Sequence, residues 1–472
     1  MNAEELAAQI GAWKDDQTRL YRGLAEQLRL LIRLGSLPPG SELPPERRLA
    51  VALAVSRTTI AQAYSLLKDE GWLVSLQGSG TRVAHAQPAV APPADYGAAA
   101  SGFIADVVRD RSRTVDLTVP SPPPGPWLMA AMSRLPALAA AALPGRVYEP
   151  AGYPALRERI AGKLTADGRV TAAEEVIVTN GATQALSLLA GVLTRRGDTV
   201  LVEELTCPTV LASLRTAGLR LVVVPIEREG VDPQAVEAAV RRYEPSFIYV
   251  IPTYHNPTGW TITERRRAAL ASIARRYGVP LVEDLTLADT RIDGPLPPPP
   301  IGAYAPGAQI YTVGSLSKVC WPGLRIGWLI GPRRELQRIV HLRAMYDLGC
   351  PLPTQLLAVE LLDDLPQIRL ERQRELLGRR DALLAALAEH LPQWRHESPH
   401  GGLSVWCATP RPLQQLNHVA QHHGMQLMLG SHFAVGARSY LDHVRLPFTL
   451  DEAELVEVVR RLAGYWVEAG RG

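Results

Sequence analysis

The chain has 472 residues, which is enough for about three domains of ordinary size. It carries 50 basic and 47 acidic side chains and a net charge of +3, which excludes a histone-like polycation and an acidic disordered chain. Any contact with nucleic acid must therefore be local. Chemistry that needs an amine has only four lysines to draw on, which are Lys14, Lys68, Lys163 and Lys318.

The compartment is indicated by the cysteines and by the N-terminus. The four cysteines are far apart and form no CxxC pair, which is typical of a reducing environment. The first residues lack the basic-then-apolar order of a secretory signal. The longest run of alanine and leucine, 135–143, contains Pro136 and is far shorter than a membrane span. We expect a soluble, cytoplasmic protein with no membrane partner and no metal site.

Residues 14–84 predict three helices followed by a hairpin. Leucine and isoleucine recur at helical spacing from Leu20 to Ile32, and the glycine and prolines that follow end this helix. A short helix is expected over about 45–54, and a third over 58–70 with Ser56 as its N-cap. The segments 72–75 and 81–84 flank a glycine-rich turn and predict two paired strands. Three helices and a two-stranded wing describe a winged helix.

The third helix has the composition of a DNA reader. Its first turn offers short donors and an arginine, which reach base edges and phosphates when a helix enters the major groove. Arginines on the preceding helix can hold phosphates, and glycines at the wing let backbone amides approach DNA. The expected DNA contacts are Arg47, Arg48, Ser56, Arg57, Thr58, Thr59, Gly78, Gly80 and Thr81. The alternative is a winged helix used for protein contacts, with Arg57 as a solvated charge.

Four motifs give this segment a family resemblance. The elements PPERRLA, VSRTTI, LLKDEGW and QGSGTRV follow one another in order, and the segment resembles a GntR-family winged helix over its whole length. The resemblance implies a DNA operator, read as two half-sites by a dimer. Residues 85–114 open with prolines and alanines and lack periodicity, so we interpret them as a linker.

After the linker, strand-like and helical stretches alternate through residues 115–472. The apolar strand-like runs are 175–178, 199–202, 219–225, 247–251, 281–283 and 310–313. This rhythm predicts an α/β fold with a largely parallel sheet, whose ligands bind near the carboxyl ends of the strands. We place this large part at about 145–345 and a smaller α+β part at about 346–472.

Lys318 is the lysine with the strongest chemical context. It follows the strand-like run 310–313 on a loop with Ser315 and Ser317, and Arg325 comes shortly after. Such an amine can form a Schiff base with an aldehyde whose phosphate the hydroxyls and the guanidinium hold. In a chain that uses arginine almost everywhere, a lysine here indicates a role that guanidinium cannot fill. The alternative is an ordinary surface lysine.

Further segments occur in the order typical of class I/II aminotransferases. They are the Y-x-P-x-G segment at 148–152, the turn at 179–184 before a helix, N-P-T-G at 256–259 and E-D at 283–284. Residues 115–472 resemble this family, which has the pyridoxal phosphate fold type I, almost throughout. The resemblance implies the cofactor pyridoxal 5'-phosphate, with Lys318 as its Schiff base, Asp284 on the pyridine nitrogen and Asn256 on the phenolic oxygen.

The same resemblance assigns the remaining site residues. The other cofactor contacts that it implies are Gly181, Ala182, Thr183, Ser315, Ser317 and Arg325. Tyr148 is implied to reach the phosphate held by the neighbouring subunit, which requires a homodimer. Arg445, in HVRLPF at 443–448, is implied to bind a substrate or effector carboxylate with its planar fork. From the residues alone, Asp284 could instead cap a helix, and Arg445 could instead form a structural ion pair.

Two positions depart from the family pattern. Cys207 stands where the family commonly has a tyrosine that stacks on the pyridine ring. Thr286 stands where regulators that contain such an aminotransferase-like domain commonly have a tyrosine that bonds the phenolic oxygen. Both changes are expected to weaken the tuning of the cofactor while its anchoring stays intact. The sequence therefore favours slow turnover or none.

The order of winged helix, linker and aminotransferase-like domain resembles that of MocR-type transcription regulators. This resemblance implies a regulator that senses an amino compound, or pyridoxal phosphate itself, through an aldimine at Lys318. It also implies a homodimer, in which the winged helices are either exchanged between subunits or not. Two alternatives stay open: an active aminotransferase that carries a DNA-binding module, and a cofactor-free scaffold that only positions the wings.

Overall fold

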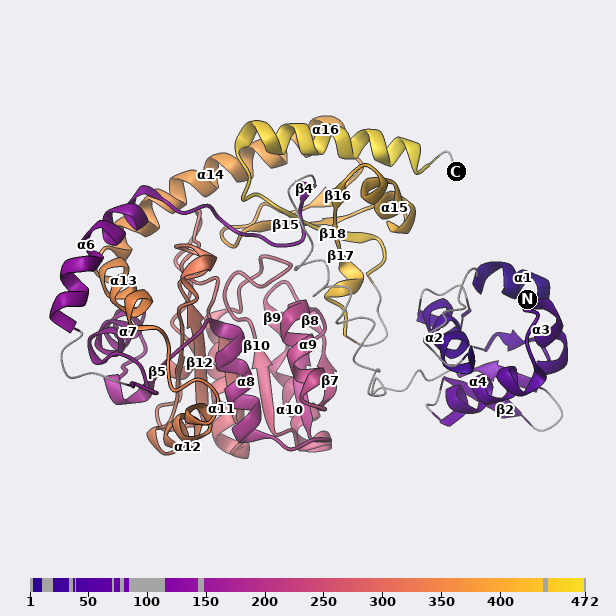
Figure 1. Cartoon of the computed structure of the whole chain (residues 1–472), viewed down its shortest axis with the longest axis horizontal. Coiled ribbons are helices and arrows are strands. Elements are labelled where there is room, and N and C mark those ends of the chain that lie inside the picture. The colour runs from indigo at the N-terminus through magenta and orange to yellow at the C-terminus, as the bar shows by residue number, and fades with distance from the viewer. Residues whose placement is uncertain are drawn as a thin grey trace. The chain divides into compact units, whose positions relative to one another are not determined.

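The computed structural model describes residues 3–10, 20–33, 37–38, 40–69, 72–76, 80–84, 115–142, 148–435 and 440–470. These residues form two compact units, one that ends at residue 84 and one that begins at residue 115 (Figure 1). Each unit has a hydrophobic core of its own. Within the described ranges, no helix combines the length and the apolar character needed to cross a membrane.

The first unit is a small helical domain with one sheet. Its elements are α1 (Ala3–Ile10), α2 (Leu20–Arg33), β1 (Glu42–Leu43), α3 (Glu46–Ala52), α4 (Arg57–Asp69), β2 (Leu73–Leu76) and β3 (Gly80–Val83). The strands pair antiparallel in the order β1-β3-β2. Apolar side chains at helical spacing, among them Leu24, Leu28 and Leu67, are fully buried between the helices. The first helix was not predicted, although Leu6 and Ile10 complete this core.

A seven-stranded sheet forms the centre of the second unit. Its strands are β5 (Val176–Thr179), β6 (Thr199–Glu203), β7 (Arg220–Val224), β10 (Phe247–Val250), β11 (Leu281–Asp284), β12 (Ile310–Ser315) and β13 (Gly327–Ile330), in the order β5-β13-β12-β11-β10-β6-β7. Only β13 runs antiparallel to its neighbours. The sequence prediction missed β13, because this strand is short and no α-helix separates it from β12.

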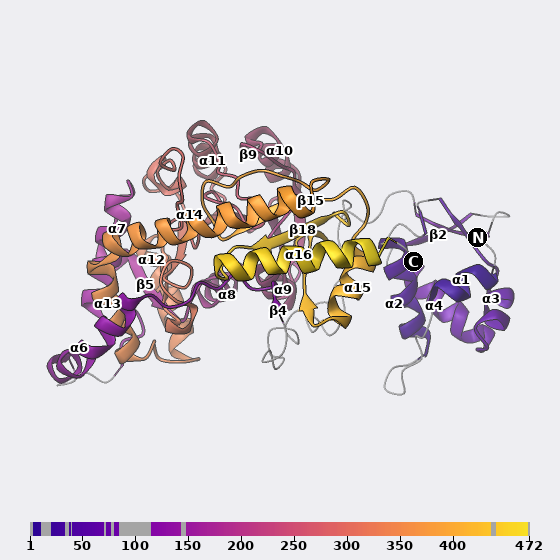
Figure 2. The ribbon, with the colours of Figure 1, turned by 90° about the horizontal axis from the view of Figure 1, so that it is seen from above.

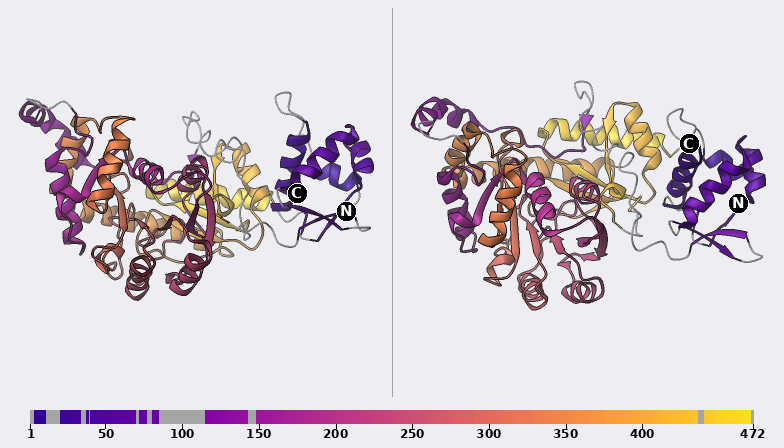
Figure 3. Two further views of the ribbon diagram at one scale, coloured as in Figure 1. Left: turned by 90° about the horizontal axis from the view of Figure 1, so that it is seen from below. Right: turned by 60° about the horizontal axis from the view of Figure 1, so that its bottom comes forward.

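Helices cover both faces of this sheet. They are α6 (Pro126–Ala142), α7 (Pro154–Ala166), α8 (Ala182–Leu193), α9 (Pro208–Thr216), α10 (Pro233–Tyr243), α11 (Glu264–Tyr277), α12 (Arg333–Ala344) and α13 (Leu352–Asp363). The ribbon shows helices on both sides of the strands (Figures 1 and 3). On β6, Val200 and Val202 pack with α8, α9 and α12, whereas Leu201 packs with α10 and α11. This alternation explains why both faces of the parallel strands are apolar.

A smaller α+β part completes the second unit. Its elements are α14 (Leu365–His390), β14 (Arg395–His396), β15 (Ser404–Ala408), α15 (Gln414–His422), β16 (Met425–Gln426), β17 (Met428–Leu429), β18 (His443–Pro447) and α16 (Glu452–Glu468). The four main strands are antiparallel in the order β14-β15-β18-β17, and α14 lies alongside α16 (Figure 2). A further short hairpin joins β8 (Ile226–Glu227) to β9 (Gly230–Val231).

The first described segment of the second unit belongs to this smaller part, whereas the predicted linker, 85–114, lies outside the described residues. β4 (Val115–Asp116) pairs in parallel with β16, and Leu117 is buried in the core formed by α14, α15 and α16. The smaller part is therefore assembled from both ends of the second unit. This arrangement places residues 118–121 beside the cavity described below.

Candidate functional site

One cavity at the carboxyl ends of the parallel strands collects most of the predicted site residues. Its volume is about 280 Å³. The predicted residues that line it are Ala182, Thr183, Asn256, Asp284, Ser315, Ser317, Lys318, Arg325 and Arg445. The place agrees with the rule that ligands of parallel α/β sheets bind beyond the strand ends.

Lys318 lies on the loop after β12 and points its amine into this cavity. Its Nζ donates a hydrogen bond of 2.9 Å to the carbonyl oxygen of Pro120. Removal from water, assisted by the nearby Arg445 and Arg325, lowers the pKa of Lys318 to about 8. The neutral amine, which is the form that attacks an aldehyde, is therefore far more abundant near neutral pH than for an exposed lysine, although it is still the minor form.

Asp284 ends β11 and is held from two sides. Its Oδ2 accepts a hydrogen bond of 2.7 Å from the Tyr249 hydroxyl on β10, and its Oδ1 accepts one of 2.9 Å from the backbone N–H of Thr286. Burial raises the pKa of Asp284, although these hydrogen bonds oppose the rise. A cationic ring nitrogen placed against this carboxylate would stabilise its charged form. Tyr249 was not predicted.

The opposite end of the cavity has the features of a phosphate site. Gly181 caps α8 with φ = 87°, and the free N–H groups of the first helical turn follow it. A Cβ on Gly181 would lie 2.6 Å from Nη2 of Arg325, so only glycine allows this guanidinium so close. The Oγ of Ser315 lies 2.8 Å from that of Ser317 and accepts a hydrogen bond from the Ser317 backbone N–H. These groups form a compact set of donors.

Arg445, on β18, is buried at the other side. Its Nη1 donates to Oδ1 of Asn256 at 3.3 Å, and its Nη2 donates to the carbonyl oxygen of Thr118. Among the described residues, its Nε is buried without a hydrogen-bond partner. The guanidinium also lies 5.1 Å from the ring centroid of Phe433. Burial lowers the pKa of Arg445 to about 10, so the side chain still carries its charge at neutral pH.

Two backbone carbonyls of the segment after the linker were not foreseen as site groups. Thr118 accepts from Arg445 and Pro120 accepts from Lys318, so two of the cations that line the cavity hold one short stretch of chain. Backbone acceptors carry no residue-type signature. The sequence therefore offered no signal for them.

The two departures from the family pattern both line the cavity. Cys207 directly precedes α9, and its Sγ lies 3.2 Å from Oγ1 of Thr209. Thr286 contributes its backbone N–H to Asp284. Tyr148 does not line the cavity of its own chain and is 66% exposed.

The predicted DNA contacts of the first unit lie near the surface. Six of them are exposed, namely Arg47, Arg48, Ser56, Arg57, Thr58 and Gly80, whereas Thr59 and Thr81 are half-buried and Gly78 lies outside the described residues. The Oγ of Ser56 accepts a hydrogen bond of 3.1 Å from the backbone N–H of Thr59, as an N-cap does. Arg57 donates from Nε to Glu46 at 3.2 Å, which orients it at the start of α4.

Comparison with known proteins decides the family. The family model of class I and II aminotransferases matches residues 127–462, and the model of the GntR family of bacterial regulatory proteins matches residues 20–83. The chain belongs to the class I and II aminotransferases. This aminotransferase domain is joined to a GntR-type DNA-binding domain, which confirms the predicted fold class and the predicted combination of domains.

Similar proteins include both regulators and aminotransferases. The probable rhizopine catabolism regulatory protein MocR of Rhizobium meliloti is 32% identical over 403 residues, which cover 81% of this chain and 80% of MocR. The HTH-type transcriptional regulator YisV of Bacillus subtilis is 29% identical over 82% of this chain and 83% of YisV. Together with the GntR-type domain, this likeness confirms the prediction of a MocR-type transcription regulator.

Among solved structures, LysN of Thermus thermophilus is similar to the second unit. LysN is an α-aminoadipate aminotransferase complexed with N-(5'-phosphopyridoxyl)-L-leucine. It is 27% identical, with a TM-score of 0.69, and the match covers 78% of this chain and 95% of LysN. The residues of the aminotransferase domain described above suit a pyridoxyl phosphate group, because an amine, a carboxylate and a glycine-capped helix with an arginine meet at one cavity.

Proposed function

We propose that this MocR-type regulator binds DNA through residues 20–83 and senses an amino compound, or pyridoxal phosphate itself, in the cavity of its aminotransferase domain. One observation carries the sensing role. The two cations that suit the cofactor and a carboxylate, Lys318 and Arg445, both donate to the chain segment that follows the linker. Ligands that take over these donors change what holds this segment in place.

Pyridoxal phosphate is the cofactor, and the residues of the cavity have distinct tasks towards it. When bound, it supplies an aldehyde for the Lys318 amine and a ring that withdraws electrons. The N–H groups after Gly181 and the Arg325 guanidinium would bind its phosphate, Asp284 would keep a proton on its ring nitrogen, and the Asn256 amide would donate to its phenolic oxygen. Of these groups, the Lys318 amine is the one that must give up its present partner, the Pro120 carbonyl.

Arg445 is positioned to bind a carboxylate. Its unpartnered Nε and its Nη2 form one edge of the guanidinium, the edge that takes a carboxylate through two parallel hydrogen bonds. Nη2 now donates to the Thr118 carbonyl, so an effector carboxylate competes with this segment for the same donor. Such competition gives an effector different affinities for two arrangements of the chain, typically worth about 1–3 kcal/mol of coupling.

A homodimer is the assembly that we propose. Tyr148, Met345 and Tyr346 are 66%, 76% and 74% exposed in the single chain, which is unusual for such large apolar groups. They lie on adjacent segments, because a Cβ on Gly349 would lie 2.7 Å from the carbonyl oxygen of Glu149. A second copy that covers this surface would bring Tyr148 to the partner's phosphate site. Winged helices that are exchanged or not exchanged between subunits both suit this role.

A second candidate function is transamination. The lowered pKa of Lys318 suits a residue that moves a proton at neutral pH, and the cavity also holds the carboxylate and the arginine that the reaction needs. Cys207 and Thr286 replace two tyrosines that are common at these positions in related proteins, and the absence of these rings favours slow turnover. A cofactor-free scaffold that only positions the wings would have no need for the Lys318 amine in this cavity.

The DNA response of the cofactor-loaded full chain tests the sensing role. A duplex selected from a random library serves as operator, and fluorescence anisotropy reports its dissociation constant before and after a panel of amino acids is added. We expect at least one amino acid, or pyridoxal phosphate itself, to change this constant by roughly 5- to 150-fold. A constant that no compound changes, together with rapid transamination, would establish the second candidate instead.

A further inference from the structure

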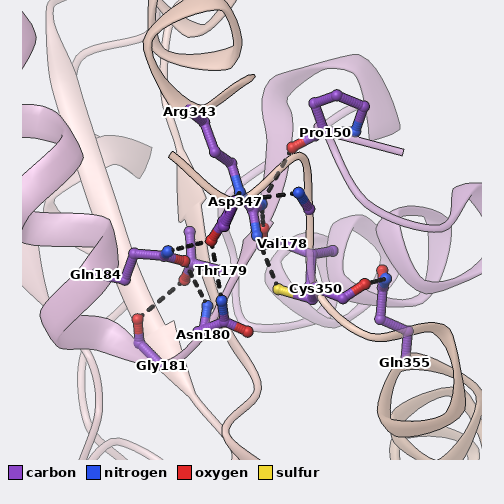
Figure 4. A network of polar contacts seen from close by, with 11 residues as sticks. Pro150, Val178, Thr179, Asn180, Gly181, Gln184, Arg343, Asp347, Cys350 and Gln355 are labelled. Carbon is purple, nitrogen blue, oxygen red and sulfur yellow. Dashed lines mark hydrogen bonds and ion pairs between the residues drawn. The ribbon is translucent and has the colours of Figure 1, made fainter. Parts of the chain in front are cut away.

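Two of the side chains that hold the turn between β5 and α8, those of Gln184 and Asp347, do not line the cavity. Asn180 directly precedes Gly181, and residues behind the turn bind both its backbone N–H and its side-chain amide (Figure 4). Its backbone N–H donates to Oε1 of Gln184 at 2.7 Å, and its Nδ2 donates to Oδ2 of Asp347 at 3.1 Å. Its carbonyl oxygen accepts from Nη2 of Arg325 at 2.8 Å. The position of the phosphate-binding turn therefore depends on Asp347 and Gln184.

Asp347 uses both of its oxygens fully. Oδ2 accepts from Asn180 and, at 2.5 Å, from Nε2 of Gln184, and Oδ1 accepts from Nε of Arg343 at 2.8 Å and from the Gly349 backbone N–H at 3.0 Å. Four donors thus converge on one carboxyl group, and Figure 4 shows three of them, from Asn180, Gln184 and Arg343, around it. Only an ionised carboxylate offers acceptor positions for all four.

Arg343 connects this carboxylate to the segment that carries Tyr148. Its side chain is fully buried, and Nη1 donates to the carbonyl oxygens of Pro150, at 3.1 Å, and of Val178. Its Nη2 donates to Sγ of Cys350 at 3.0 Å. A buried arginine needs a charged partner, and among the described residues Asp347 is the carboxylate in contact with it. The pair joins β5, the Tyr148 segment and the start of α8.

We propose that Asp347, fixed by Arg343, is the positioning residue of the phosphate-binding turn. It does not line the cavity. It acts through Asn180 and Gln184, which set where Gly181 and the first N–H groups of α8 lie. The same pair links cofactor anchoring to the exposed surface around Tyr148 and Met345, where we place the second copy. This inference rests on the proposed cofactor site.

Asp347→Asn is the decisive variant. The substitution keeps the shape of the side chain, but one oxygen becomes an NH₂ group that faces donors instead of accepting from them. We expect the full chain to bind pyridoxal phosphate about tenfold more weakly or worse. Pyridoxal, which lacks the phosphate, should bind the variant and the wild type within about twofold. Absorption titrations with both aldehydes measure the two affinities.

The chain offers a matched control in Asp167→Asn. Asp167 also forms an ion pair with a basic residue four positions earlier, Lys163, at 2.6 Å, and its side chain is 28% exposed against 25% for Asp347. It has no contact with the turn among the interactions of the described residues. This variant should bind pyridoxal phosphate like the wild type, so a general loss of stability cannot imitate the expected result.

Gln184→Ala is the second variant, in case Asp347→Asn does not fold. It removes one donor to Asp347 and one acceptor of Asn180 at a half-buried position, and alanine favours the helix. It should weaken the binding of pyridoxal phosphate but not that of pyridoxal, and by a smaller factor than Asp347→Asn. Equal losses for pyridoxal and pyridoxal phosphate, or no loss in either variant, would overturn the inference. If the wild type itself bound neither aldehyde, the proposed cofactor site would fail instead.

Discussion

The two units of this chain use their cations in opposite ways. In the winged helix, Arg47, Arg48 and Arg57 are exposed, and the Arg57 side chain keeps 71% of its surface in water. In the aminotransferase domain, Lys318 and Arg445 are withdrawn from water, which lowers their pKa values to about 8 and about 10. Exposed arginines keep their charge and are screened by salt, whereas a buried amine responds to pH and to its partners. The contrast teaches that DNA binding should depend on salt and ligand sensing on pH.

In the DNA-binding unit, the largest loss of operator binding is expected from a substitution of Arg57. Arg57→Ala should weaken operator binding roughly 5- to 150-fold, because an arginine at the start of α4 reaches base edges. Anisotropy titrations against the selected operator measure this loss. Lys68→Ala, in the last turn of the same helix, is the control for a general loss of positive charge. Equal losses for the two variants would remove Arg57 from the recognition surface.

On the ligand side, Arg445 gives an effect of similar size. Arg445→Ala should weaken the binding of an amino acid by roughly 10- to 150-fold, because hydrogen bonds to charged groups contribute about 1.5–3 kcal/mol. Spectral titration of the cofactor-loaded chain measures this affinity. Arg445→Lys should not restore it, since lysine lacks the planar fork. Ethylamine, which has no carboxylate, should bind both proteins alike, and a parallel loss for ethylamine would contradict a carboxylate role.

The pH dependence of cofactor addition sharpens the contrast further. Because the pKa of Lys318 is lowered to about 8, its neutral form is scarce at pH 7 and dominates at pH 9. The rate of band formation with pyridoxal phosphate should therefore rise about tenfold between these values and then level off. Stopped-flow absorption measures the rate. A rise that continues beyond pH 10, as for an exposed lysine, would contradict the buried position of this amine.

The smallest effect is expected at Gly181, and Gly197 provides its control. Both glycines have positive φ, 87° and 93°, but a Cβ would meet Arg325 only at position 181 and nothing within 4 Å at position 197. Both alanine variants should lose about 1 kcal/mol of unfolding free energy from backbone strain. Only Gly181→Ala should also weaken the binding of pyridoxal phosphate, by about fivefold, since it displaces Arg325. Equal cofactor affinities in the two variants would remove this close approach from the phosphate site.

The sequence predicted those parts of the site that depend on short contiguous motifs. The lysine loop, the glycine-capped turn and the Asn256 segment each lie within a few contiguous residues, so short motifs together with the family resemblance indicated them. The carbonyls of Thr118 and Pro120 lie 327 and 198 residues away from the cations that they bind, and a backbone oxygen has no signature. Asp347 was missed for a related reason, because a carboxylate in the turn after a helix becomes significant only through the residues that fold against it.

The fold was predictable to a similar extent. Apolar runs that alternate with helices identified the parallel strands, because both faces of such strands are buried. The antiparallel β13 escaped prediction, and so did the return of β4 to the smaller part, because both depend on contacts between distant segments. In the winged helix, local periodicity was sufficient for three of the helices, whereas α1 is stabilised by packing on the others.

The absorption spectrum of the full chain with pyridoxal phosphate, before and after amino acids are added, tests the central claim most directly, with Lys318→Ala as control. The account predicts a band that requires Lys318 and that an amino acid shifts to a new, long-lived position. Rapid and complete conversion to the pyridoxamine form, reversed by a keto acid, would contradict a sensor and establish an aminotransferase that carries a DNA-binding domain.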